Sequence, residues 1–489
     1  MIRNRVWIGL ALIFLPVVGR TLWYHRGFYR PPAPIQLPAY SEFSPPLPPV
    51  GEAAIELPEA TAAPEGPLAG PPKVVLFDRS HSNRFSMPEL RSLTAALSSQ
   101  GGRIEVLDSS FAFDELGLEG RLKYASSYVV VAPSVVFSPS EVTAVERFVE
   151  HGGRLLVVLD PTRTGSGFDI FGFLILSASE DVSTANQLLE SFNLAFSDDY
   201  LYNLMDNEGN FRNVLLRNFG EHPLTAGLQT VALYAARSVQ TEAGTLLLSG
   251  DSATLSSLTD TGGGLAAAAL DPGSQALALG DLTFMTPPYD KVADNARLIQ
   301  NLAEFLLDGD RRPDLHNLPF VFSGPVSVVQ SADFALQAET LVALQGMSTA
   351  LLPAGVSLSF PEEVPAEGDL LVLGLFEPDP ELGELIEPLG LVLPAEGSDG
   401  RLAAPGFGSF NPAGIGFVGL ARSEARTTLV LLASDQAGLV SLLESVGQGL
   451  LSDCLLSDTS ALCQVGEGAG LGSSEPLEFD LSFEETFNQ

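Results

Sequence analysis

The sequence is poor in the residues from which most enzyme active sites are built. Its 489 residues include two cysteines, five histidines and three lysines. No Gly-x-Ser-x-Gly nucleophile motif, phosphate-binding loop, His-Glu-x-x-His or Cys-x-x-Cys motif occurs. A zinc site needs several histidine or cysteine ligands close together, so this scarcity argues against a metal centre. We therefore expect no catalytic nucleophile, no metal site and no cofactor.

Positive charge is also scarce. The 25 Lys and Arg residues are outnumbered by 60 Asp and Glu residues, which gives a formal net charge of −35. A surface with such an excess of negative charge repels phosphate backbones. We therefore expect no nucleic-acid partner.

A long apolar run opens the chain. Val6 to Tyr24 is 19 residues, which as a helix spans roughly 28 Å, about one bilayer core. Trp7 and Trp23 lie where an interfacial aromatic belt would be. Residues 1–30 are expected to form an uncleaved membrane anchor, and a cleaved signal peptide is the alternative. Either places the bulk of the chain outside the cytoplasm, as a single-pass membrane protein or, after cleavage, a secreted one.

The two cysteines, Cys454 and Cys463, lie nine positions apart. A disulfide that closes such a short loop is plausible in an exported protein. Two buried free thiols are the alternative.

Changes in composition divide the rest of the chain. Residues 31–72 contain 13 prolines, which predicts an extended spacer of up to about 130 Å at ~3.1 Å per residue; a tract read by proline-binding domains is the alternative. Residues 73–312 alternate strand and helix patterns, which predicts an α/β domain with a parallel sheet between two helical layers. Residues 318–463 predict a second, smaller α/β domain. Residues 464–489 are expected to be an acidic, flexible tail.

Four predicted strands of the first domain end in aspartate, at Asp78, Asp108, Asp160 and Asp281. The carboxyl ends of parallel strands share one edge of a sheet, so these carboxylates have the chance to converge there. Converging carboxylates bind hard cations or shift one another's pKa. The alternative is local, because aspartate often follows a strand to cap the next turn or helix.

The segment "DRSHSNRF" follows the first of these strands and adds His81 and Asn83 to Asp78. A histidine at this position would orient a ligand or act as a base. The alternative is a loop in which these side chains only hold the backbone. Our candidate ligand-binding edge comprises Asp78, His81, Asn83, Asp160 and Asp281.

Residues 73–310 resemble a bacterial and archaeal domain family of unknown function. The resemblance rests on "VVLFDRSHSNRF", on "SPSEVTAVERFVEHGGRLLVVLD" and on the closing "GDLTFMTPPYDKVADNARLIQNLAEFLL". It implies the class I glutamine amidotransferase-like fold, with relatives among auxiliary proteins of ABC-type transport and gliding motility. In active amidotransferases of this fold, a cysteine nucleophile stands about where Asp160 lies here. Pro161 follows it and has no N–H for an oxyanion hole, so the resemblance implies a domain without that chemistry.

These observations lead to two hypotheses of different classes. The first is a membrane-anchored, extracytoplasmic binding or assembly module with a protein partner, as an accessory to an ABC-type transport or envelope complex. The second is a metal-assisted hydrolase that uses Asp78, His81 and Asp160 at the strand-end edge. A sugar- or peptide-binding envelope protein is a third possibility, and it would require an aromatic-lined cleft.

Overall fold

The computed structural model describes most of residues 73–466 and a short N-terminal stretch. Residues 14–22 are helical and exposed. Within the described residues, no helix is long and apolar enough to cross a membrane. The predicted anchor lies only partly within these residues, and the proline-rich linker and residues 467–489 lie outside them. The described ranges are 14–22, 73–108, 116–163, 165–168, 174–177, 179–331, 336–377, 380–393, 401–423, 426–451 and 454–466.

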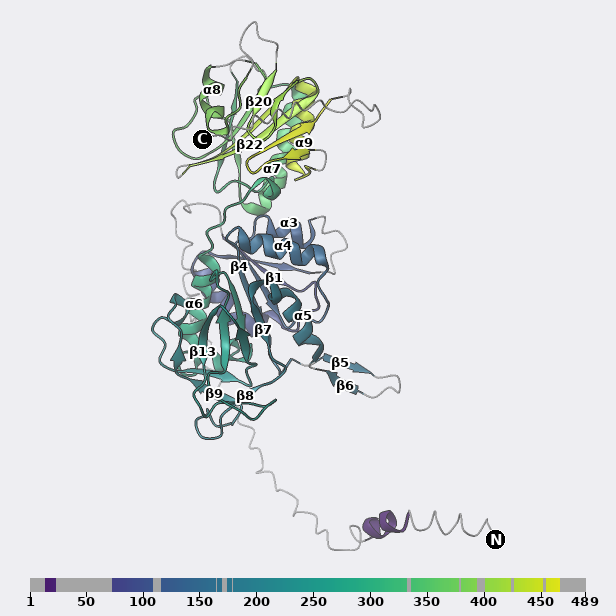
Figure 1. The fold of residues 1–489 in the computed structure, drawn as a ribbon, viewed down its shortest axis with the longest axis vertical. Helices are drawn as coiled ribbons and strands as arrows, with labels where there is room; N and C mark the ends of the chain where they lie inside the picture. The colour runs from purple at the N-terminus through teal and green to yellow at the C-terminus, as the bar shows by residue number, and fades with distance from the viewer. Residues whose placement is uncertain are drawn as a thin grey trace, which may run out of the picture. The chain divides into compact units, whose positions relative to one another are not determined.

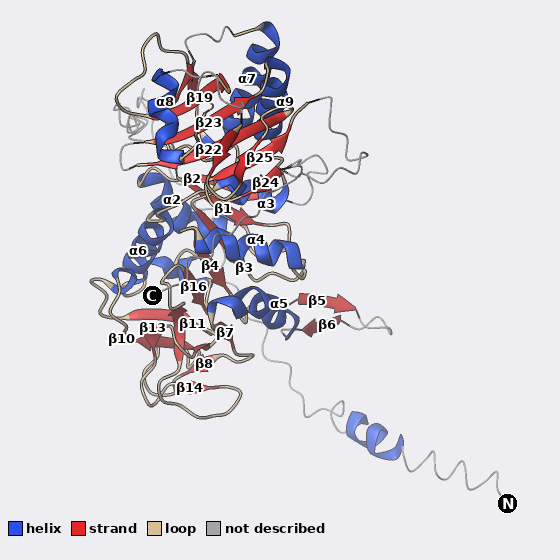
Figure 2. Ribbon diagram, turned by 45° about the horizontal axis from the view of Figure 1, so that its top comes forward, coloured by secondary structure: helices blue, strands red, loops and turns tan. Residues whose placement is uncertain are grey.

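Residues 68–489 form the second of two units. In the second unit, the larger sheet has a parallel half of five strands (Figures 1 and 2). Their order is β16-β4-β3-β1-β2, and every adjacent pair in it is parallel. Their carboxyl ends therefore lie at one edge. The strands are β1 (Val74–Asp78), β2 (Arg103–Leu107), β3 (Ser127–Val131), β4 (Arg154–Val158) and β16 (Ala276–Leu279).

The other half of this sheet is antiparallel. It continues outward from β16 through β15, and all of its pairings run antiparallel. Its strands are β7 (Leu194–Phe196), β10 (Asn218–Phe219), β12 (Val239–Thr241), β13 (Thr245–Ser249) and β15 (Ala266–Leu270). Three short two-stranded ribbons accompany it: β5 (Gly165–Phe168) with β6 (Leu174–Ser177), β8 (Leu201–Tyr202) with β14 (Leu255–Ser256), and β9 (Asn213–Leu216) with β11 (Val231–Tyr234).

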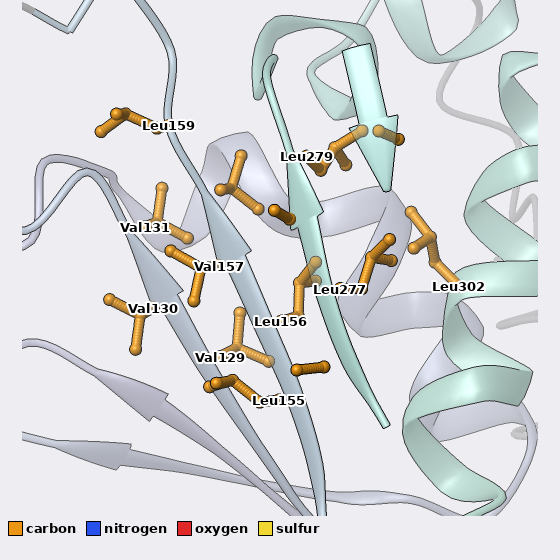
Figure 3. Packing of buried hydrophobic residues seen from close by; sticks show 14 of the residues in the cluster. Val129, Val130, Val131, Leu155, Leu156, Val157, Leu159, Leu277, Leu279 and Leu302 are labelled. Carbon is orange, nitrogen blue, oxygen red and sulfur yellow. The ribbon is translucent and has the colours of Figure 1, made fainter. Parts of the chain in front are cut away.

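Helices cover both faces of the parallel half. Helix α2 packs with α6, and α3 packs with α4; right-handed crossovers from this strand order place the two pairs on opposite faces. Between them the sheet is buried on both sides: Leu155, Leu156 and Val157 follow one another in β4, so they alternate between the two faces, and all three are fully buried (Figure 3). The helices are α2 (Arg91–Ser99), α3 (Gly117–Leu122), α4 (Pro139–Glu150), α5 (Ser179–Leu189) and α6 (Asn295–Leu307).

The unit from α4 to β4 shows how the sequence determines this arrangement. Ser138 and Glu141 form a capping box at the start of α4, which satisfies otherwise unpaired N–H groups. After the helix, Gly152 adopts a φ of +88°, and a Cβ there would lie 2.0 Å from the carbonyl oxygen of Asp310. Glycine is therefore required at this turn, which reverses the chain into β4.

The second sheet has seven strands in the order β18-β17-β19-β23-β22-β25-β24. The first four are parallel and the last three antiparallel. Alternate residues face two separate cores: Leu371 and Leu373 pack in one, Leu370 and Val372 in the other.

The strands of this sheet are β17 (Val326–Gln330), β18 (Leu358–Ser359), β19 (Asp369–Leu375), β22 (Ile415–Arg422), β23 (Thr427–Ala433), β24 (Cys454–Leu456) and β25 (Ser460–Gln464). The ribbon β20 (Leu402–Ala404) with β21 (Gly408–Phe410) adjoins the core of Leu370 and Val372. The helices are α7 (Ala338–Leu351), α8 (Pro380–Ile386) and α9 (Gln436–Gly447).

The α/β class and a second α/β sheet are therefore as predicted, but the first sheet is mixed rather than parallel throughout. The difference arises before β16: residues 271–275 join β15 to β16, and these two strands pair antiparallel. Short connections of this kind join antiparallel neighbours, whereas parallel neighbours need a crossover of a dozen or more residues.

Candidate functional site

Asp78 is the last residue of β1, and its side chain is completely buried. Its Oδ1 accepts hydrogen bonds from the Ser80 N–H (2.9 Å) and the Ser80 hydroxyl (2.6 Å). Its Oδ2 accepts from Asn83 Nδ2 (2.6 Å) and lies 2.8 Å from His81 Nδ1. The Asp78 carboxylate thus contacts three residues of the loop after β1: Ser80, His81 and Asn83.

His81 lies between two carboxylates. Its Nδ1 faces Asp78, and its Nε2 lies 3.4 Å from Glu141 Oε1, near the start of α4. The ring also stacks on Phe137, with centroids 3.7 Å apart. Burial alone would lower the pKa of His81, but the charges and hydrogen bonds of Asp78 and Glu141 outweigh it and raise the pKa above its usual value. The protonated imidazole is therefore favoured.

Asn83 joins this loop to the next strand. Its Nδ2 donates to Asp78, and its Oδ1 accepts from the Val131 N–H at the end of β3 (2.6 Å). Tyr128, on the same strand β3, has a fully buried side chain. Burial and the neighbouring charge of Asp78 raise the pKa of Tyr128 well above its usual value, so the phenol stays neutral. We call Asp78, His81, Asn83, Tyr128 and Glu141 the first cluster.

The backbone around the first cluster is strained at two positions. Ser82, in the loop after β1, has a φ of +50°, and Ala132, directly after β3, has a φ of +45°. Residues other than glycine rarely adopt this left-handed region, and it costs on the order of 1–3 kcal/mol. In the part of the chain that the structure describes, Asp160 is not among the positive-φ residues. The strained residue at the end of a strand is therefore Ala132, after β3, and not Asp160, after β4.

Asp160 follows β4 and is 2% exposed. Its Oδ1 accepts from the Thr162 N–H (2.8 Å) and hydroxyl (2.6 Å), which forms a local turn over Pro161. Its Oδ2 accepts from the Leu282 N–H and the Thr283 hydroxyl, both at 3.1 Å. Asp160 therefore ends its own strand and holds the segment that follows β16.

Asp281 follows β16 and is fully buried beside Asp160. Its two oxygens accept from the Tyr234 N–H and the Thr283 N–H, each at 2.7 Å. Burial and the charge of Asp160 raise the pKa of Asp281 well above its usual value, more than its backbone hydrogen bonds lower it. Asp281 therefore keeps its proton to a higher pH than an exposed aspartate does. We call Asp160 and Asp281 the second cluster.

Arg163 connects the loops that carry the two clusters. Its Nη1 lies 2.5 Å from Glu89 Oε1, and its carbonyl accepts from Arg84 Nη1 (2.9 Å). Its Nε is 4.0 Å from Asp160 Oδ2. The predicted edge is thus held together by ion pairs and backbone contacts.

The five predicted site residues form two groups rather than one. Asp78, His81 and Asn83 share one network, and Asp160 and Asp281 share another. In the described ranges, no group of three or more histidine, cysteine, aspartate or glutamate side chains has the arrangement of a metal site. The fourth strand-end aspartate, Asp108, lies nearer the surface, 3.8 Å from Arg79.

Sequence reasoning missed the two residues that complete the first cluster. Glu141 was identifiable only as the fourth residue of the capping box "SPSE", and nothing in the sequence shows that it also faces His81. Tyr128 lies within an ordinary buried strand, "SYVVV". A Gly-x-Gly-x-x-Gly run, Gly414 to Gly419, was also missed. It lies within and just before antiparallel strand β22, not at a strand-to-helix turn, so it lacks the context of a dinucleotide site.

Cys454 and Cys463 form a disulfide with an S–S distance of 2.07 Å. They are directly opposite each other in the antiparallel pair β24–β25. The bridge closes the hairpin at one edge of the second sheet.

Comparison with known proteins gives structural likeness only. No family model and no curated protein matches the chain. The mmIFT52 N-terminal domain aligns at 17% identity with a TM-score of 0.38, over 48% of this chain and 98% of that one. A protein described as ThuA-like from Bacteroides uniformis aligns at 13% identity with a TM-score of 0.31, over 50% and 96%. Another protein described as ThuA-like, from Parabacteroides merdae, aligns at 12% identity with a TM-score of 0.25, over 49% of this chain and 91% of that one.

Proposed function

We propose that this chain is a non-catalytic binding and assembly module, held outside the cytoplasm by an N-terminal membrane anchor. The observation that carries the proposal is that the candidate edge is satisfied from within. Asp78, Asp160 and Asp281 are each at most 2% exposed, and the carboxylate oxygens accept hydrogen bonds from the chain's own loops. Buried groups that hold loops together leave no reactive atom for a substrate.

The proposal extends to an accessory role in an ABC-type transport or envelope complex. The amidotransferase-like fold suggested by the sequence resemblance of residues 73–310 supports this role. The apolar N-terminus and the proline-rich spacer suit a body held away from a bilayer.

Two measurements test the location and the assembly. A periplasmic-type reporter fused after residue 72 is expected to be active, whereas a reporter active only in the cytoplasm would overturn the location. When the full-length chain is extracted from native membranes in mild detergent, we expect native electrophoresis to show a complex larger than 51.7 kDa plus the micelle. Migration as a lone chain would count against assembly.

A metal-assisted hydrolase is the competing function. It requires a divalent cation at the first or second cluster. We expect Mn²⁺ or Zn²⁺ at 1 mM to leave the thermal unfolding temperature unchanged, both in the natural chain and in a His81→Gln variant. Stabilisation of the natural chain that is lost in the variant would favour the hydrolase instead.

A further inference from the structure

The second sheet carries a groove along one of its edges. The groove has a volume of about 820 Å³. One wall is the carboxyl half of β17, a second is the segment 360–364, and a third is α8. Phe360 and Val364 line it although they are 55% and 43% exposed, so apolar surface is left uncovered there. An exposed apolar surface of this kind commonly marks an interaction site.

The wall formed by β17 is an incompletely paired strand edge. On one side β17 pairs with β19 through all five residues, from Val326 to Gln330. On the other side β18 pairs only with Val326 and Ser327. The last three residues of β17 therefore have no strand partner on the groove side among the described residues.

Backbone hydrogen bonds on the two sides of β17 establish which backbone groups face the groove. The Val326 N–H donates to Ser357 O, on the β18 side, and the Ser331 N–H donates to Leu373 O, on the β19 side. Because peptide groups alternate along a strand, the N–H and C=O of Gln330 point toward the β18 side. Gln330 is also exposed. This edge presents a donor and an acceptor to an incoming strand.

The negative charge of the groove favours a positively charged partner. Glu362, Glu363 and Glu384 line it and are exposed, and no lysine, arginine or histidine does so among its described lining residues. From Asp314 to the C-terminus the chain has 25 acidic residues and three arginines. A basic segment would be attracted to this groove and an acidic one repelled.

We propose that this groove binds an extended protein segment that carries basic side chains and adds to β17 as a further strand. In this mode, main-chain hydrogen bonds to the strand edge supply affinity, and side-chain pockets supply specificity. Phe360 and Val364 would contact apolar side chains of the segment, and the three glutamates would pair with its lysines or arginines. This inference deepens the proposed function, because it names the chemistry of the partner.

The test uses the full-length chain in detergent and a fluorescein-labelled, end-capped peptide, Lys-Val-Thr-Val-Lys-Val-Thr-Lys. A matched peptide has glutamate in place of each lysine. By fluorescence anisotropy, the basic peptide is expected to bind at least about tenfold more tightly than the acidic one, with affinity falling as salt rises. Equal binding of both peptides, or of neither, would overturn the proposal.

Two pairs of variants locate the binding. Glu384→Lys, on α8, is expected to weaken binding about fivefold to tenfold, whereas Glu444→Lys, the same change on the exposed face of α9, leaves it unchanged. Gln330→Pro removes the N–H that faces the groove without removing a bond to β19, and is also expected to weaken binding. Gln330→Ala keeps that N–H and serves as its control. Equal effects within either pair would contradict strand addition.

Hydrogen exchange separates this inference from the proposed function. We expect the amide of Gln330, whose N–H faces the groove, to exchange rapidly in the free chain and to be protected by the basic peptide. Slow exchange in the free chain would mean that the protein itself covers this edge, which would overturn the inference. A lone chain in native electrophoresis together with peptide protection would instead refute assembly and keep the groove.

Discussion

The first and second clusters lie at the same edge of one sheet but differ in the charges that they bury side by side: opposite charges in the first and like charges in the second. In the first, Asp78 faces an imidazole, and that imidazole faces a second carboxylate. In the second, Asp281 faces another carboxylate, Asp160. A buried pair of opposite charges favours both ionised forms, whereas a buried pair of like charges favours protonation of one member. Similar strand endings in the sequence thus produce sites with different responses to pH and to substitution.

The largest expected effect follows from removing the acceptor of the first cluster. Asp78→Ala leaves the Ser80 N–H, Asn83 Nδ2 and His81 Nδ1 without their shared partner. We expect a loss of about 3–4 kcal/mol in unfolding free energy, because removing one member of a buried pair leaves the other uncompensated. The measurement is hydrogen exchange of peptides covering residues 74–90 at increasing urea concentrations. Tryptophan fluorescence would not report unfolding of this domain, because both tryptophans, Trp7 and Trp23, lie outside it.

Asp78→Asn is the matched variant for this experiment. It keeps the shape and one acceptor oxygen, so about half of the loss is expected. If Asp78→Ala costs less than about 1 kcal/mol, the first cluster does not hold the loop and the carboxylate is free for another role.

The difference between the clusters also explains what the sequence can reveal. The partners of Asp78 lie two, three and five residues away, in "DRSHSN", so the loop network could be anticipated as one of two alternatives. Asp160 has local bonds to Thr162, but its other partners, Leu282 and Thr283, are 122 and 123 residues away. No local pattern encodes that pairing, because it depends on β16 lying beside β4.

Alternation of apolar runs and capped helices predicted the parallel half, where strands of four or five residues alternate with helices. In the antiparallel half, β7, β10 and β12 have only two or three residues, and so short a run carries little periodicity. Where those strands pair depends on long-range contacts, so the mixed character of the sheet could not be predicted.

The second-largest expected effect is on the pH dependence of the unfolding free energy, to which Asp281 contributes. Its pKa is raised in the folded chain, so folding is most favoured when it is protonated, and this stability is lost as pH rises from about 4 toward the raised pKa. The slope reaches at most about 1.4 kcal/mol per pH unit. In Asp281→Asn this slope is expected to vanish above about pH 4, as measured by urea unfolding at several pH values.

Asp160→Asn provides the control for the like-charge pair. Removing that charge lowers the pKa of Asp281, although burial still raises it, so the pH-dependent loss shrinks without disappearing. An unchanged slope in both variants would show that the second cluster is not the source of the pH dependence.

A smaller effect is expected from His81, in a different pH range. Its folded pKa is raised, so its stabilising contribution is fully present below about pH 6.5, the usual pKa of histidine, and is lost as pH rises through the raised value. His81→Gln is expected to remove on the order of 1 kcal/mol at pH 6 and almost none at pH 9. A loss that is equal at both pH values would mean that the imidazole is neutral in the folded chain.

The smallest expected change in unfolding free energy comes from substituting Glu141, which has two roles. Its carboxylate accepts from the Ser138 N–H at 2.8 Å and the Ser138 hydroxyl at 2.7 Å, and it also faces His81. Burial raises the pKa of Glu141, but the Ser138 hydrogen bonds and the His81 charge outweigh this and lower it. Glutamine can also complete a capping box, so Glu141→Gln is expected to cost only a few tenths of a kcal/mol, because the side chain is one-third exposed and solvent screens its charge.

The same variant is nevertheless expected to lower the pKa of His81, measured by NMR titration of its imidazole, because one of its two carboxylate neighbours becomes neutral. Glu141→Ala loses the cap as well and is expected to cost about 1 kcal/mol. If Glu141→Gln shifts the titration of His81 while leaving α4 intact, the charge at the start of this helix is part of the first cluster. If the titration does not move, Asp78 alone holds the proton on His81, and the contrast between the clusters reduces to one carboxylate paired with histidine against two paired with each other.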